Sequence, residues 1–187
     1  MKIRPRLLVT SLTVAVVVSV VVGWLIARSG GTSSSATRNT FAPPAIATNA
    51  PVKGKRLADA TVQDLKGADV TTASLLGEPL VINIWGSTCG PCKKELPDFA
   101  TVQQQFAGKV RFVGIDYLPP SNDEEQFARS RGVKYDLFYD TNGDFISKVG
   151  IGAFPVTLFI KPDGTIVQQT GQLDAARLTT LTQALLA

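Results

Sequence analysis

The sequence contains no histidine, and its only two cysteines, Cys89 and Cys92, stand three positions apart. Without histidine, neither a Ser-His-Asp nor a Cys-His nucleophilic centre can be assembled. A structural zinc ion takes four ligands, so one cysteine pair without histidine cannot enclose zinc within a single chain. A structural zinc site within one chain is therefore not expected, and the sequence implies no other metal and no organic cofactor.

Charge is also sparse. Only 18% of the 187 residues are charged, 44% are hydrophobic, and the net charge is +4. This balance supports a packed core. Much of the basic excess lies in the N-terminal part of the chain, and no compact basic patch is interleaved with aromatic residues. Nucleic-acid binding is therefore not expected.

Residues 7–27 form one long run without a charge, which is enough to cross a bilayer as a helix. Three basic residues, Lys2, Arg4 and Arg6, precede the run, against Arg28 immediately after it. This asymmetry predicts that residues 1–6 are cytoplasmic and that the chain from residue 28 onward lies outside the cell membrane. The run is thus interpreted as a single-pass transmembrane signal anchor.

A cleaved signal peptide is the alternative for this run. Its apolar region usually spans about 7–15 residues and ends in an A-x-A-like cleavage site. The run at residues 7–27 is longer, and Leu25-Ile26-Ala27 is a poor cleavage site. The uncleaved anchor is favoured, and in either case the remainder of the chain is exported.

Residues 28–56 are rich in Ser, Thr, Ala, Gly and Pro and have no sustained apolar period. This composition predicts a flexible linker between the anchor and a domain at residues 57–187. A flexible stretch of about 25 residues has a root-mean-square reach of about 25–30 Å. The domain is therefore expected to reach partners in or near the membrane.

Apolar runs alternate with turn signals and amphipathic segments within residues 57–187. Long strands, apolar and rich in β-branched residues, are predicted at 80–85, 110–115 and 155–160. Shorter elements are a hairpin around Lys66-Gly67 and strands at 137–139 and 165–169. Helices are predicted at 91–106, 122–131 and 145–149, and after Asp174. This order predicts an α/β fold with a central mixed sheet flanked by helices and an N-terminal hairpin extension.

Two of the predicted helices begin with capping signals. Asn122, followed three residues later by Glu125, resembles a capping box. Asp174 is expected to cap the last helix, whose leucines at 178, 181 and 185 share one face.

The motif Cys89-Gly90-Pro91-Cys92 lies between a predicted buried strand and a predicted helix start. The first sulfur would lie near unpaired N–H groups at the positive end of the helix dipole. That setting lowers the pKa of a thiol and makes it a nucleophile near neutral pH. The second sulfur lies within the helix and can attack the mixed disulfide that the first one forms.

A static structural disulfide is the alternative for this pair. A structural bridge usually closes a long loop, whereas a two-residue loop restrains the unfolded chain little. The order strand, loop, CxxC, helix is typical of redox proteins. Cys89 is therefore predicted to attack substrates and Cys92 to resolve the intermediate.

The segment Trp85-Gly-Ser-Thr-Cys89-Gly-Pro-Cys92-Lys-Lys-Glu-Leu-Pro97 resembles the active site of thioredoxins, and most closely that of the TlpA/ResA-like thioredoxin family. The similarity covers about residues 57–187, with the motifs in the expected order. It implies a thioredoxin-like fold and a membrane-anchored, extracytoplasmic thiol–disulfide oxidoreductase. The active-site surroundings that it implies are Trp85, Thr88, Gly90, Pro91 and Pro97, the last matching the proline that kinks the family's active-site helix.

Residues 152–160 resemble the cis-proline strand of the same family. The resemblance implies that the Phe154–Pro155 bond is cis and lies beside Cys89. The Phe154 backbone would then be free to pair with an extended substrate peptide, which makes Phe154 and Pro155 candidate substrate-binding residues. An ordinary proline at a strand entry is the alternative.

At a few positions the predicted active site differs from those of the TlpA/ResA-like family and of cytoplasmic thioredoxins. Thr88 stands where the family usually has Trp, so the rim of the site is expected to be smaller and more polar. Asn83 stands where cytoplasmic thioredoxins have a buried Asp, so protons must be handled by water or another carboxylate. Glu95 is a candidate, although a solvated position on the helix surface is expected for it. Asp116 is expected to cap a strand end rather than act as an acid.

Together these patterns predict an enzyme that reduces disulfides of exported proteins. In the resembling branch, electrons typically come from a CcdA- or DsbD-like membrane protein, and a common substrate is the CxxCH motif of apocytochrome c during cytochrome c maturation. The Gly90-Pro91 dipeptide, as in thioredoxin, favours a reductant. We expect a monomer.

Other functions are less compatible with the sequence. An oxidant or isomerase for exported proteins is the main alternative. A thiol peroxidase needs Thr three residues before its reactive Cys, where this chain has Gly86, and a Sco-like copper-binding module needs a histidine. A non-catalytic interaction domain would be indicated by inert thiols.

Overall fold

The computed structural model describes residues 48–187. The predicted anchor at residues 7–27 and most of the predicted linker lie outside the described residues. Among the residues described, no helix is both long and apolar enough to cross a membrane.

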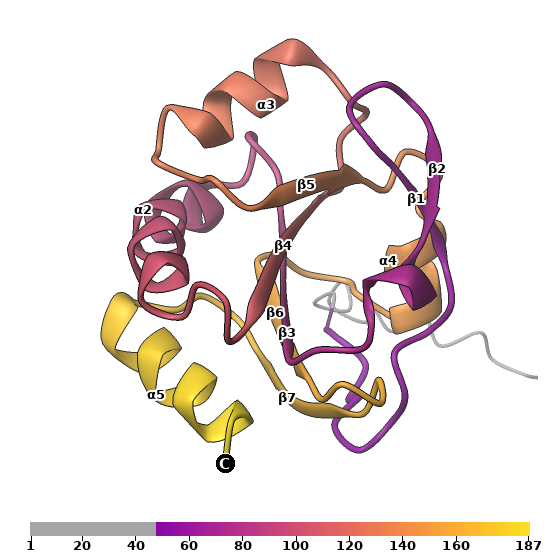
Figure 1. Ribbon diagram of the computed structural model, residues 1–187. Helices are drawn as coiled ribbons and strands as arrows, with labels where there is room; N and C mark the ends of the chain where they lie inside the picture. The colour runs from indigo at the N-terminus through magenta and orange to yellow at the C-terminus, as the bar shows by residue number, and fades with distance from the viewer. Residues whose placement is uncertain (1–47) are drawn as a thin grey trace, which may run out of the picture. The chain divides into compact units, whose positions relative to one another are not determined.

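A seven-stranded mixed sheet forms the centre of this unit, with the strand order β2-β1-β5-β4-β3-β6-β7 (Figure 1). The strands are β1 (Thr61–Gln63), β2 (Asp69–Thr71), β3 (Leu80–Trp85), β4 (Arg111–Asp116), β5 (Asp136–Tyr139), β6 (Val156–Ile160) and β7 (Ile166–Thr170). β3, β4 and β5 pair in parallel. At one edge of the sheet, β6 pairs antiparallel with β3, and β7 pairs antiparallel with β6. At the other edge, β1 pairs antiparallel with both β5 and β2. The predicted fold class is confirmed.

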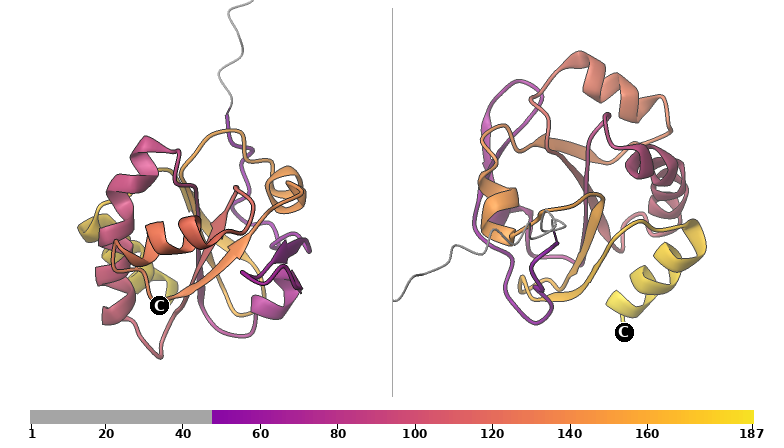
Figure 2. Two further views of the ribbon diagram at one scale, coloured as in Figure 1. Left: turned by 90° about the horizontal axis from the view of Figure 1, so that it is seen from above. Right: turned by 180° about the vertical axis from the view of Figure 1, so that it is seen from behind.

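Helices cover both faces of the sheet. They are α2 (Gly90–Gln105), α3 (Asn122–Arg129), α4 (Asp144–Val149), α5 (Ala175–Leu185) and the short 3-10 helix η1 (Thr72–Leu75). Side chains of α2, α3 and α5 pack on one face, and those of α4 and η1 on the other. Figure 2 shows α2 and α5 on the side of the sheet opposite to α4.

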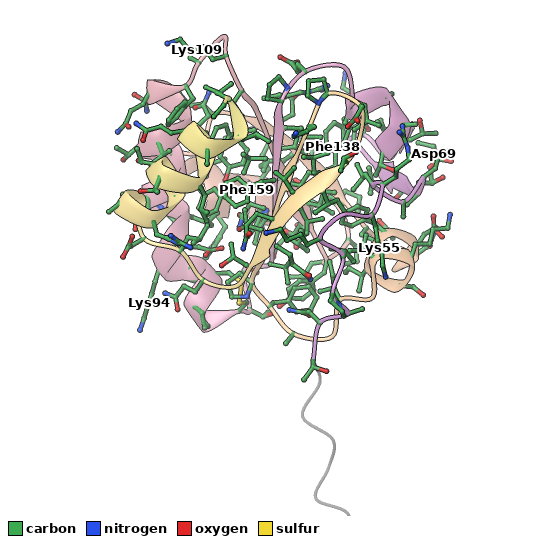
Figure 3. The ribbon with its side chains drawn as sticks, turned by 90° about the horizontal axis from the view of Figure 1, so that it is seen from below. Lys55, Asp69, Lys94, Lys109, Phe138 and Phe159 are labelled. Carbon is green, nitrogen blue, oxygen red and sulfur yellow. A yellow bond between two sulfur atoms is a disulfide. The ribbon has the colours of Figure 1, made fainter. Side chains whose placement is uncertain are left out.

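The alternation of side chains along the strands divides the core in two. Phe159 belongs to the apolar cluster under α2 and α5, and Phe138 to the cluster under α4 and η1. Figure 3 shows these two phenylalanines toward opposite sides of the sheet. All six residues of Leu80–Trp85 are buried, as expected of a strand covered on both faces.

The start of α3 differs from its prediction. The N-cap is Ser121 rather than Asn122, and the Ser121 hydroxyl accepts a hydrogen bond from the Glu124 N–H at 3.1 Å. An N-cap residue needs an extended backbone, which Ser121 has, whereas Asn122 is already helical. At α5 the prediction is confirmed, because Asp174 accepts a hydrogen bond from the Arg177 N–H at 2.8 Å.

The chain packs against the domain before residue 57. The Asn49 side-chain oxygen accepts hydrogen bonds from the N–H groups of Gly152 and Ala153, each at 2.9 Å. Val52 is only 5% exposed. Residues 49–56, which the sequence assigned to the linker, therefore form a strap along the domain, which we call the N-terminal strap.

Candidate active site

The two cysteines form a disulfide at the start of α2, with an S–S distance of 2.06 Å. Cys89 is the N-cap residue, and its sulfur accepts a hydrogen bond from the Cys92 N–H at 3.2 Å. Cys89 is half-exposed, whereas Cys92 is fully buried against the core. One sulfur is thus reachable from solvent at a helix N-terminus, and the other is held behind it.

The predicted surroundings of the cysteines divide into exposed and buried residues. Thr88, Gly90 and Pro91 are exposed beside Cys89, and Pro97 is exposed inside α2. Trp85 is fully buried instead, and its ring stacks on Phe127 of α3 with centroids 6.0 Å apart. Trp85 therefore anchors the active-site loop from below and does not form its surface.

The Phe154–Pro155 peptide bond is cis, as the resemblance implied. Phe154 and Cys89 are both partly buried against the same apolar cluster, which includes Cys92. A third residue, Tyr117, brings these two segments together, although Cys89 and Phe154 are far apart in sequence.

Tyr117, at the end of β4, joins these two segments and was missed by the sequence analysis. Its hydroxyl is hydrogen-bonded to Thr88 Oγ1 at 2.8 Å, and its ring lies against Phe154 with centroids 4.3 Å apart. Nothing in the sequence around Tyr117 indicates this position. A signal was available only in the general rule that residues at the carboxyl ends of parallel strands gather at one edge of the sheet.

Glu95 is buried, contrary to the prediction of a solvated helix surface. Its side chain accepts hydrogen bonds from the Asn83 amide at 2.8 Å and from the Leu173 N–H at 3.1 Å, and it is 1% exposed. Burial raises the pKa of Glu95 to about 7, although the two donors oppose the rise. Because Glu95 follows the buried Cys92 by three residues on the same helix, the two side chains are neighbours on its inner face.

Asp116 caps its strand end, as predicted. Its side chain accepts a hydrogen bond from the Leu118 N–H at 2.8 Å. Burial raises the pKa of Asp116 to about 8, and the neighbouring Glu124 carboxylate raises it further against the effect of the Leu118 N–H. Glu124 in turn accepts hydrogen bonds from the Ser87 hydroxyl and the Ser87 N–H, so α3 contacts the active-site loop directly.

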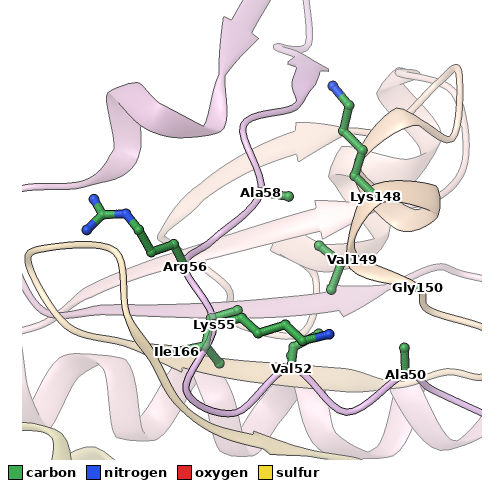
Figure 4. Close-up of a pocket in the computed structure, with 9 residues that line it drawn as sticks. All are labelled: Ala50, Val52, Lys55, Arg56, Ala58, Lys148, Val149, Gly150 and Ile166. Carbon is green, nitrogen blue, oxygen red and sulfur yellow. The ribbon is translucent and has the colours of Figure 1, made fainter.

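A separate pocket lies between the N-terminal strap and α4, and its lining contains neither cysteine. Lys55, Arg56 and Lys148 are among its lining residues, but Figure 4 shows their charged ends pointing in different directions. Within residues 48–187 no three Cys, Asp or Glu side chains gather as ligands around a metal ion would.

A disulfide-bonded cysteine pair at a helix start, after a buried strand and in a domain with a cis-proline loop, defines the class of this protein. It is a thiol–disulfide oxidoreductase of thioredoxin-like fold. The chain belongs to the AhpC/TSA family, whose family model matches residues 53–169.

Comparison with known proteins supports this assignment. The chain is 28% identical over 117 residues to the thiol-disulfide oxidoreductase ResA of Bacillus thuringiensis (strain Al Hakam), covering 62% of this chain and 68% of that relative. The structure of MTB dsbF matches with 28% identity and a TM-score of 0.60, over 72% of this chain and 99% of that one. A secreted Mycobacterium tuberculosis disulfide oxidoreductase, described as homologous to E. coli DsbE, matches with 25% identity and a TM-score of 0.58, over 66% and 94% of the two chains. The predicted resemblance to the ResA-like branch is confirmed.

Proposed function

We propose that this oxidoreductase reduces disulfides of exported proteins, with Cys89 as the attacking residue and Cys92 as the resolving one. The observation on which this proposal rests is the unequal exposure of the two cysteines. Cys89 is half-exposed at the N-terminus of a long helix, and Cys92 is fully buried. A substrate can reach only the first sulfur without displacing the core.

The exchange proceeds in two steps. The Cys89 thiolate attacks one sulfur of a substrate disulfide, which forms a mixed disulfide and releases one substrate thiolate. Cys92 loses its proton and attacks the Cys89 sulfur, which forms the Cys89–Cys92 disulfide and releases the second thiolate. Two electrons pass to the substrate, and both of its thiolates take up protons. The structure holds the oxidised form, which a dithiol donor must reduce before the next cycle.

Glu95 is the group that we assign to the proton of Cys92. Its pKa of about 7 lets it exist in both protonation states near neutral pH, which suits a general acid–base group. Glu95 lies on the inner face of α2 with Cys92. It accepts a hydrogen bond from Asn83, the residue that stands where cytoplasmic thioredoxins have a buried aspartate.

A reductant is favoured over an oxidant by the residues between the cysteines. Gly90-Pro91 is the dipeptide of thioredoxin, whose reduction potential is about −270 mV, whereas the strong oxidant DsbA reaches about −120 mV. This gap corresponds to about 7 kcal/mol for two electrons. Since the chain has no histidine, one common source of thiolate stabilisation in oxidants is missing.

The location and partners follow from the same proposal. The predicted anchor at residues 7–27 would hold the domain on the outer side of the cell membrane as a monomer. Electrons would then come from a CcdA- or DsbD-like membrane protein, and apocytochrome c is one candidate substrate. An oxidant or isomerase for exported proteins remains the alternative.

Peroxidase activity is disfavoured by a local contact. An added Cβ at Gly86 would lie 2.5 Å from Tyr117 Cε1. The Thr that a thiol peroxidase needs at this position would therefore displace the Tyr117 ring.

The proposal is tested by trapping substrates in cells on the full chain with Cys92→Ser. We expect exported proteins to accumulate as mixed disulfides on Cys89, since the resolving thiol is gone. The double variant Cys89→Ser/Cys92→Ser is the matched control and should trap nothing. Capture of no exported protein would contradict the proposal. Redox titration of the purified protein tests direction, and a potential above about −180 mV, the range of protein disulfide isomerase, would favour the oxidant.

A further inference from the structure

Two segments meet beside the disulfide, and Tyr117 contacts both of them. Its hydroxyl bonds Thr88, the residue before Cys89, and its ring packs on Phe154, the residue before Pro155. Its backbone N–H donates to the Trp85 carbonyl at 3.1 Å, which holds it at the end of β3. Tyr117 thus joins the two segments that a substrate must contact.

The ring of Tyr117 is contacted from several sides. Gly86 lies directly beneath the ring, where a Cβ would be 2.5 Å from Cε1 and 2.6 Å from Cζ. Phe154 covers one side, and Thr88 binds the hydroxyl. Even so, Tyr117 and Phe154 are both only half-buried, so part of this aromatic pair faces solvent beside Cys89.

A half-exposed aromatic pair beside a reactive sulfur is a surface on which an apolar side chain can pack. Thr88, next to Cys89, is too small to provide such a surface. Tyr117, which bonds Thr88, and Phe154 together supply a larger apolar surface from elsewhere in the chain.

We propose that Tyr117 is a specificity-determining and positioning residue, whose ring packs against an apolar side chain next to the attacked cysteine of an extended substrate. This inference rests on the proposed function and narrows its substrates to polypeptides with an apolar residue at that position. The Tyr117 hydroxyl has a separate role, because its bond to Thr88 fixes the position of the Cys89 loop relative to the Phe154–Pro155 segment.

The test compares disulfide-linked peptides that carry Leu or Gly next to the cysteine, using the reduced full chain. Hydroxyethyl disulfide, which has no side chain to pack, reports the reactivity of Cys89 itself. Tyr117→Ala should lower kcat/KM for the Leu peptide about tenfold, mostly through KM, and for the Gly peptide by only about threefold, because the Gly peptide is affected only by loss of the hydroxyl. Reduction of hydroxyethyl disulfide should fall by no more than the loss seen with the Gly peptide.

Tyr117→Phe and Thr88→Val separate the hydroxyl from the ring. Each should lower the rate with both peptides about threefold while preserving the preference for Leu. The two changes together should cost no more than either alone, because they remove the same bond. Leu118→Ala, the next residue on the same loop and also half-buried, is the matched control and should leave the preference intact.

Equal losses for the Leu and Gly peptides with Tyr117→Ala, or no loss for either, would overturn the role of Tyr117 and leave the proposed function standing. A wild-type protein that reduces neither peptide nor hydroxyethyl disulfide would overturn both. Thermal unfolding of each variant shows whether a loss of kcat/KM comes from a destabilised fold instead. If Tyr117→Ala is unfolded, the Leu preference of the folded Tyr117→Phe protein decides, and its absence would overturn the inference.

Discussion

At the residue scale, two buried carboxyl groups hold their protons well above the pH at which exposed ones release them. Glu95 has a pKa of about 7 and Asp116 a pKa of about 8, in both cases chiefly because burial disfavours the charged form. Both are linked to segments of the active site, Glu95 through α2 and Asp116 through Tyr117, its neighbour in sequence. The pH dependence of stability and of cysteine reactivity should therefore report on the surroundings of the two cysteines.

Stability should fall as pH rises because of Glu95. The pKa of Glu95 is higher in the folded state, about 7, than its ordinary value of 4.5. Its contribution is thus fully present below about pH 4.5 and is lost as the pH rises to about 7, with a total of about 3 kcal/mol. Glu95→Gln cannot ionise and should make the fall in unfolding free energy between pH 5 and 7.5 about half as steep in urea titrations. The remaining slope comes from Asp116, whose pKa of about 8 lies above this range.

Glu78→Gln is the matched control, because it makes the same chemical change at an exposed position. In the reduced Glu95→Gln variant, the rate at which Cys92 is alkylated should also depend differently on pH, because Cys92 would lose the group that accepts its proton. An unchanged slope in the Glu95→Gln variant would mean that this carboxyl group is ionised in the folded protein.

At the element scale, the position of α3 determines how the active-site loop is supported. Ser121 caps the helix, Glu124 in its first turn bonds Ser87 beside the cysteines, and Phe127 stacks on Trp85. Displacement of α3 would therefore move both Trp85, beneath the active-site loop, and Ser87, within it.

Ser121→Ala should lower the free energy of unfolding by about 1 kcal/mol, because it removes the acceptor for the Glu124 N–H. Asn122→Ala, the position that the sequence favoured as the cap, should change it by no more than about 0.5 kcal/mol. Chemical denaturation of the two variants provides the comparison. A larger effect at Asn122 than at Ser121 would restore the capping box predicted from the sequence.

At the scale of the whole domain, the N-terminal strap links the start of the domain to the loop that holds the cis Phe154–Pro155 bond. Asn49 bonds the N–H groups of Gly152 and Ala153, which directly precede Phe154. Gly54 and Leu57 donate to the carbonyls of Ile166 and Gly164 at 2.7 Å each. The strap is therefore part of the folded domain.

Removal of the strap should destabilise the domain. A protein of residues 57–187 should have an unfolding free energy lower by about 3 kcal/mol than one of residues 48–187, because Val52 and several hydrogen bonds are lost. Asn49→Ala in the longer protein should lose about 1 kcal/mol and slow peptide reduction more than reduction of hydroxyethyl disulfide. Identical unfolding curves for the two lengths would show that the strap contributes nothing.

Much of the fold could be predicted from local patterns alone. Leu80–Trp85 and Val156–Ile160 are mostly apolar runs, and their burial follows from this composition wherever they pair. The CxxC spacing and the position of Pro91 place a disulfide on the first turn of a helix. Asp174 caps α5 through a contact only three residues away. These features depend on neighbours in sequence, which is why the sequence by itself determined them.

Glu95 and Tyr117 depend on contacts that sequence patterns do not contain. A glutamate on a helix is usually solvated, and Glu95 is buried only because Asn83 and Leu173, 12 and 78 residues away, supply donors for its oxygens. Tyr117 reaches Thr88, 29 residues away, because β3 and β4 end at the same edge of the sheet. The sequence determined the reactive sulfurs and the strands and helices that hold them. Only the tertiary structure decided which distant side chains surround those sulfurs, because their contacts form across the sheet when its strands pair.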